Sequence, residues 1–108
     1  MIKLVYSIAA RGDLEEIGDY IMGQLHNPTA ALRVIRQIYQ DAERLRTFPE
    51  MGAPLNREGD GFPYRYLVSG NYLVFYHVEK EQVHVDRVLY GRRDYAGLLV
   101  DGELLPEN

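Results

Sequence analysis

The chain has 108 residues, 46% of them hydrophobic, which suits a single domain with one core. It has no cysteine, which excludes disulfides, thiolate metal sites and cysteine nucleophiles, and no apolar stretch approaches the roughly eighteen residues of a membrane span. The formal net charge of -4 disfavours a protein that wraps long nucleic acid through a uniformly basic surface.

The first 45 residues predict a strand and two helices. Lys3–Ser7 alternates in polarity and predicts a strand; its apolar run is too short for a signal peptide, so we expect a cytoplasmic protein. Ser7 can cap a helix over residues 9–25, where apolar positions recur at spacings of three and four. Asn27-Pro28 supplies an N-cap and a first helical residue for a second helix, whose apolar stripe continues to Leu45. The short connection predicts an antiparallel helix hairpin.

The second half predicts a loop and a meander of strands. Residues 49–63 contain three prolines and three glycines, so we expect a loop there. A short helical turn is predicted at residues 95–99, and the domain is expected to span residues 1–99 with a tail at residues 100–108. The predicted strands are Tyr64–Val68, Tyr72–Val78 and Val83–Leu89, joined by turns at residues 69–71 and 80–82.

This order predicts an α+β fold, in which the antiparallel helix hairpin packs on a mainly antiparallel four-stranded sheet. The apolar sheet face is expected to hold Leu73, Phe75, Val83 and Val85. Four of the nine tyrosines are expected to be core or half-buried sheet residues rather than platforms for RNA bases: Tyr6, Tyr66, Tyr72 and Tyr76.

Arginines crowd the end of the last predicted strand. Ten of the twelve basic residues are Arg, whose planar fork binds phosphates and carboxylates. Arg87 lies between apolar neighbours, so it either pairs with a carboxylate such as Asp86 or Asp94 or protrudes toward a partner. Gly91 allows a turn that brings the following arginines to the rim of the sheet. The polar surface expected to bind a partner comprises Arg65, Arg87, Tyr90, Arg92, Arg93 and Asp94.

The three histidines, His26, His77 and His84, do not stand at helical i, i+4 spacing, so we predict no metal site, and we expect no cofactor. His77 and His84 could be proposed as general bases. Each lies in a predicted strand, however, where a hydrogen-bonded structural role is the favoured interpretation.

Four segments together resemble the ParE/RelE toxin superfamily, from about residue 1 to residue 99: Phe48–Gly52, Tyr64–Val68, Tyr72–Tyr76 and Arg87–Asp94. The most specific is Arg-Val-Leu-Tyr-Gly-Arg-Arg-Asp, which is similar to a ParE-like ending with His in place of Tyr90. The resemblance implies a bacterial toxin of a type II toxin–antitoxin, plasmid stabilisation-type system. It also implies a small cognate antitoxin whose disordered C-terminal part folds over the toxin's helices and sheet.

The superfamily contains two activities: RelE-like members cut messenger RNA in the ribosome, and ParE-like members inhibit DNA gyrase. The RelE catalytic positions fall at Pro63, Arg65, Tyr72, Arg93 and near Leu99. Only Arg65 and Arg93 keep suitable chemistry, and metal-free phosphoester cleavage needs both preorganised charge and a proton-transfer group. The resemblance therefore favours a gyrase inhibitor that is not an enzyme and has no small-molecule substrate.

Two alternatives stay open. The first is a ribosome-dependent, metal-independent mRNA endonuclease, in which Arg65 and Arg93 stabilise the phosphate and Tyr90 or Tyr95 transfers the proton; its partners are the ribosome and mRNA. The second is a non-toxic domain that only binds its antitoxin.

Overall fold

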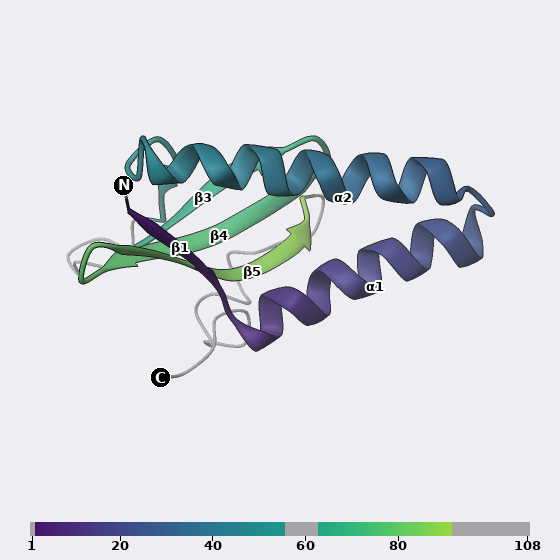
Figure 1. The fold of residues 1–108 in the computed structure, drawn as a ribbon, viewed down its shortest axis with the longest axis horizontal. Helices are drawn as coiled ribbons and strands as arrows, with labels where there is room; N and C mark the ends of the chain where they lie inside the picture. Colours follow the sequence, from purple (N-terminus) through teal and green to yellow (C-terminus); the bar gives the residue numbers. More distant parts are fainter. Residues whose placement is uncertain (1, 56–62, 92–108) are drawn as a thin grey trace.

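Two helices pack on a five-stranded sheet in the computed structural model, which describes residues 2–55 and 63–91 (Figure 1). The strand order is β1-β5-β4-β3-β2, with β1 parallel to β5 and the other pairs antiparallel. The predicted α+β architecture is confirmed. The predicted helical turn at residues 95–99 and the predicted tail at residues 100–108 lie outside the described residues.

Ser7 joins the first strand to the first helix. Strand β1 spans Lys3–Tyr6 and helix α1 spans Ile8–Gln24. The Oγ atom of Ser7 accepts a hydrogen bond from the Ala10 N–H at 2.9 Å, so the predicted N-cap is confirmed. The same hydroxyl donates to the Asp86 carbonyl at 2.8 Å, which fixes the start of α1 against β5.

Helix α2 spans Pro28–Glu43 and runs back along α1, as predicted (Figure 1). The Asn27 side chain accepts from the Ala30 N–H at 3.0 Å, and Pro28 occupies the first helical turn. A 3₁₀ turn, η1, follows at Arg44–Arg46. Near the end of α2, Asp41 accepts a 2.7 Å hydrogen bond from Ser69, which connects the helix to β3.

The sheet has one strand more than predicted. Within the segment expected to be a loop, Ala53–Pro54 forms strand β2, which pairs with β3 (Tyr64–Ser69). Proline lacks a backbone N–H, but at a sheet edge it loses no ladder bond. A two-residue strand containing proline gives no alternating pattern, which is why the sequence did not reveal it.

Strands β4 (Tyr72–Glu79) and β5 (Gln82–Tyr90) form the central hairpin, and a bulge interrupts their pairing. Tyr76 pairs with Val85 and Phe75 with Arg87, so Asp86 is the extra residue. Because a bulge reverses the alternation, Val85 and Val88 both face the helices. The side chain of Arg87 leaves the strand on the opposite face, beside Phe75.

The predicted sheet face was partly wrong. Val83 and Val85 do lie in the helix-covered core, but Phe75 and Leu73 belong to a second cluster with Leu89 on the other face. The inward residues of β4 are Val74 and Tyr76. The predicted burial of four tyrosines is confirmed, since Tyr76 is buried and the others are half-buried: Tyr6, Tyr66 and Tyr72. Neither helix in the described ranges has the length and apolar content needed to cross a bilayer.

The β4–β5 turn provides a test of local strain. Its two residues, Lys80 and Glu81, have φ of 52° and 60°, the left-handed pair typical of a type I′ turn that favours Asn-Gly. We expect Glu81→Gly to raise the free energy of unfolding by about 0.5 kcal/mol, because relief of the left-handed cost exceeds glycine's entropy. Gln82→Gly, one residue later in β5, should lower it by a similar amount. A lower urea midpoint for Glu81→Gly would contradict this.

Candidate functional site

A carboxylate on α1 binds Arg87, one of the arginines predicted for the polar surface. The Asp13 oxygens accept hydrogen bonds from Arg87 Nε at 2.8 Å and Nη2 at 2.9 Å. Asp13 is buried, with 7% of its surface exposed, and these hydrogen bonds raise the pKa of Arg87 above its ordinary value. Arg87 therefore connects β5 to α1. Asp86, one predicted partner, contacts His77 instead, and Asp94 lies outside the described residues.

Asp13 also closes the exposed edge of β5. The β1 partner strand ends opposite Val85, and the next inward residue, Val88, donates its backbone N–H to Asp13 at 2.9 Å. The carboxylate thus takes the place of a neighbouring strand and satisfies a buried donor. Together with the Ser7 hydroxyl at the start of the helix, Asp13 fixes the position of α1 against β5.

Beyond this junction, a groove of about 480 Å³ opens between α1 and the edge of the sheet where β4 begins and β5 ends. Tyr20 and Leu25 line its helical side, and Tyr72 and Tyr90 line its sheet side. The rings of Tyr72 and Tyr90 lie 5.7 Å apart, and burial raises the pKa of Tyr72. The groove is therefore largely aromatic and apolar, with Asp13 and Glu16 at its border.

Arg65 is bound to the backbone of its own chain. Its Nη1 donates to the Gly52 carbonyl at 2.9 Å and to the Glu50 carbonyl at 3.2 Å, where β2 joins the sheet. Arg65 pairs with Tyr76, on the helix-covered face, whereas Arg87 pairs with Phe75 on the opposite face. The structure therefore does not bring these two predicted site residues into one cluster.

The structure also separates Arg65 from Tyr90. Four residues along β3 and two strand spacings divide their backbones, which places the Cα atoms about 16 Å apart. With the Arg65 guanidinium held by carbonyls at the β2 edge, the two side chains do not meet at a common phosphate. The other predicted site residues, Arg92, Arg93, Asp94 and Tyr95, lie outside the described residues.

A histidine cluster lies at the β4–β5 hairpin. His77 Nδ1 contacts an Asp86 oxygen at 2.7 Å, and both side chains are buried, so the predicted hydrogen-bonded role of His77 is confirmed. Burial raises the pKa of Asp86, while the hydrogen bond from His77 acts in the opposite direction. His84 stacks on His77, with ring centroids 4.9 Å apart, and Tyr64 contacts His77 edge-on.

Sequence reasoning missed the buried Asp13, and it offered Asp86 as a partner of Arg87 rather than of His77. Asp13 was one acidic residue among several on an amphipathic helix, and 74 residues separate it from Arg87, so no local pattern marked it. The histidine pair did leave a signal, because a two-residue turn at Lys80–Glu81 makes His77 and His84 direct neighbours. The expectation of no metal site used helical spacing alone and did not consider this strand pairing.

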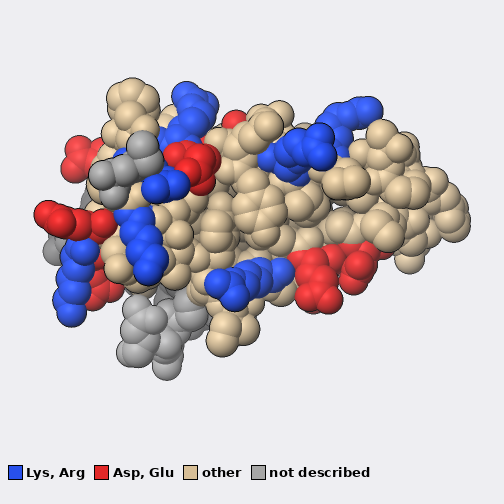
Figure 2. All heavy atoms as spheres, in the orientation of Figure 1, with Lys and Arg blue, Asp and Glu red and all other residues tan. Residues whose placement is uncertain are grey.

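Charges of both signs are interspersed on the face shown in Figure 2, and no broad basic area forms there. The tip of the helix hairpin has no charged side chain, because residues 20–32 contain no Asp, Glu, Lys or Arg (Figures 1 and 2). We define the hairpin-tip patch as the large apolar side chains that are more than half exposed there: Tyr20, Met22, Leu25 and Leu32. Such exposed apolar groups are typical of protein-binding surfaces.

The molecule is thus a small α+β protein, and the exposed apolar side chains at its uncharged hairpin tip are of the kind that bind other proteins. Residues 4–95 match the family model described as the ParE toxin of the type II toxin–antitoxin system parDE. The chain belongs to this family of toxins. Its fold is similar to that of a solved structure titled as the chromosomal ParDE toxin–antitoxin system from P. aeruginosa, with a TM-score of 0.70 and 22% identity. The match covers 83% of this chain and 96% of that one. No curated protein sequence matches this chain.

Proposed function

We propose that this toxin inhibits DNA gyrase and is neutralised by a cognate antitoxin. The observation that supports gyrase over the ribosome is that the two arginines of the predicted polar surface within the described residues, Arg65 and Arg87, bind groups of the toxin itself. Arg65 is bonded to backbone carbonyls and Arg87 to Asp13, so both serve the toxin's own structure. A metal-free ribonuclease needs such groups directed at the reacting phosphate.

The hairpin-tip patch and the adjacent groove supply a surface for a protein partner. Tyr20 and Leu25 belong to both, and Tyr90 closes the groove at the end of β5. Aromatic side chains with a polar atom are enriched where proteins bind tightly. Arg92, Arg93 and Asp94 follow Tyr90 in the sequence, and we assign them to the polar part of the same binding surface for gyrase or antitoxin.

The test is supercoiling of relaxed plasmid DNA by gyrase with purified toxin. Leu32→Glu places a charge in the hairpin-tip patch and should weaken inhibition about tenfold, which corresponds to about 1.4 kcal/mol of binding free energy. Val68→Glu is the matched control, because Val68 is equally exposed, at 60%, on the sheet face opposite the helices. It should inhibit like the unmodified toxin.

A parallel assay with ribosome-bound mRNA separates the alternatives. Cleavage of message without any effect on supercoiling would overturn the proposal, and loss of that cleavage in Tyr90→Phe would identify the proton-transfer group. Expression in bacteria without antitoxin adds a cellular readout. Filamentation supports gyrase as the target, rapid translation arrest supports the ribosome, and normal growth at high expression means that the domain only binds its antitoxin.

A further inference from the structure

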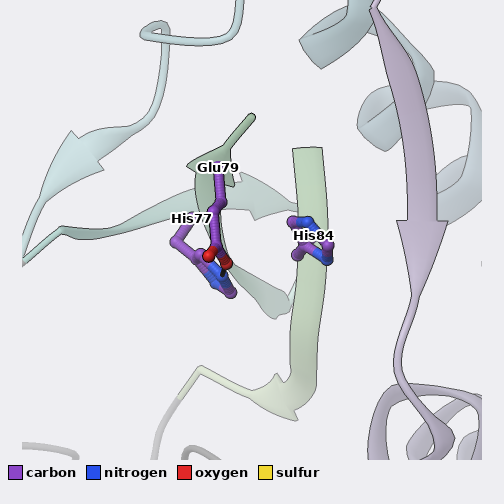
Figure 3. A group of neighbouring side chains, drawn as sticks. All are labelled: His77, Glu79 and His84. Atoms are coloured by element: carbon purple, nitrogen blue, oxygen red, sulfur yellow. Dashed lines mark ion pairs between the residues drawn. The ribbon is translucent and has the colours of Figure 1, made fainter. Parts of the chain in front are cut away.

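Three side chains with metal-binding atoms lie together where β4 and β5 form their hairpin (Figure 3). His77 and His84 are partners across the two strands. A carboxylate oxygen of Glu79, two residues along β4, lies 3.5 Å from His77 Nε2. One donor atom from each of the three lies within 4.8 Å of the others.

Two carboxyl groups flank the His77 ring. Its Nδ1 lies 2.7 Å from an oxygen of the buried Asp86, the contact that orients a histidine whose other ring nitrogen binds a metal ion. Its Nε2 lies 3.5 Å from the Glu79 oxygen, so a metal ion between these two atoms could be bound by both. His84 supplies a third donor that a metal ion can use.

We propose that His77, Glu79 and His84 bind a divalent transition-metal ion of the Zn²⁺ type. Two imidazoles and one carboxylate are a donor set that Zn²⁺ accepts, with the fourth tetrahedral position left to water. The contact between His77 Nδ1 and Asp86 matches the carboxylate–histidine–metal arrangement that orients a ligand ring.

The required movement is small. Ligand atoms of a tetrahedral zinc site, with bonds of about 2.1 Å, lie about 3.4 Å apart. The donors therefore close from at most 4.8 Å to that separation. The Glu79 oxygen already lies 3.5 Å from His77 Nε2, and its side chain is 54% exposed and can rotate. The remaining closure requires the His84 ring, now stacked on His77 with an interplanar angle of 10°, to tilt toward the ion. The bound ion would hold the two strands together beside the left-handed Lys80–Glu81 turn, so it stabilises this hairpin.

Calorimetric titration of the full chain with ZnCl₂ tests the site. We expect one equivalent of Zn²⁺ to bind, removal of the ion by EDTA, and a rise in the melting temperature while it is bound. Glu79→Gln and His84→Gln should each weaken binding at least about tenfold, and Asp86→Asn about tenfold through loss of the orienting contact. Glu81→Gln is the matched control, since it removes the same charge from the adjacent turn and should leave binding unchanged.

Co²⁺ gives a second readout, because a tetrahedral cobalt site absorbs strongly in the visible range, and His84→Gln should lose that absorption. Circular dichroism spectra identify any variant that fails to fold. Glu79→Gln alters an exposed side chain, so this variant should fold and allows the site to be tested even if His84→Gln does not fold. Absence of saturable Zn²⁺ binding would overturn the proposal. Equal affinity in His84→Gln, or its loss in His26→Gln, would also overturn it.

Discussion

Asp13→Ala is expected to lower the free energy of unfolding by about 3 kcal/mol, because it leaves the Arg87 guanidinium and the Val88 N–H without the carboxylate that binds both. Removal of one member of a buried ion pair costs more than the pair itself contributes, since the remaining charge stays partly desolvated. The measurement is urea denaturation followed by circular dichroism. Asp19→Ala, at an exposed position of the same helix, is the control and should change stability by less than about 0.5 kcal/mol.

Two further variants separate charge from shape at this junction. Asp13→Asn keeps the side-chain size and one acceptor, so it should cost less than Asp13→Ala. The double variant Asp13→Ala/Arg87→Met should cost less than the sum of its single changes, because methionine has no charge that needs the Asp13 carboxylate. Strict additivity of the two single changes would show that the ion pair seen between α1 and β5 adds no coupling energy.

The Asp13–Arg87 junction also shows where sequence analysis of this fold stops. The helix starts at Ser7 and Asn27 were predictable because a cap acts on an amide three residues away. Asp13 and Arg87 meet only after the whole chain has folded, so their contact leaves no local pattern. The bulge at Asp86 adds to this, since simple alternation from Val83 and Val85 would place Arg87 in the core.

For the candidate site, too, sequence patterns within one continuous segment were informative and contacts between distant segments were not. The resemblance of the Arg87–Asp94 segment led to the correct toxin family, because that segment is continuous in sequence. The expected cluster of cations depended on how the strands pair. The structure places Arg65 and Arg87 on opposite faces of the sheet. The groove between α1 and β5 could not be predicted either, because its walls come from segments 46 to 77 residues apart in the sequence.

The second large effect on stability is expected at Gly52, in the loop that follows α2 and η1. At Gly52, an added Cβ would lie 2.6 Å from the Tyr76 hydroxyl oxygen and 2.7 Å from the Tyr66 carbonyl oxygen. That hydroxyl donates to the Pro49 carbonyl at 2.8 Å and accepts from the Gly52 N–H at 2.9 Å. It thereby fixes the start of β2 against the core, which leaves no space for a side chain at Gly52.

Gly52→Ala should therefore lower the free energy of unfolding by about 3 kcal/mol, since the methyl group displaces the hydroxyl and disturbs both of its hydrogen bonds. Tyr76→Phe removes one of three obstructing atoms and leaves the ring carbon Cε1 and the Tyr66 carbonyl oxygen, each at 2.7 Å, so Gly52→Ala should cost only somewhat less in that background. Gly12→Ala is a control of opposite sign: no atom lies within 4 Å of its added Cβ, and alanine favours the helix by about 0.5 to 1 kcal/mol. Equal costs of Gly52→Ala in the two backgrounds, by urea denaturation, would show that the Tyr76 hydroxyl adds nothing to the exclusion of a side chain by the other two atoms.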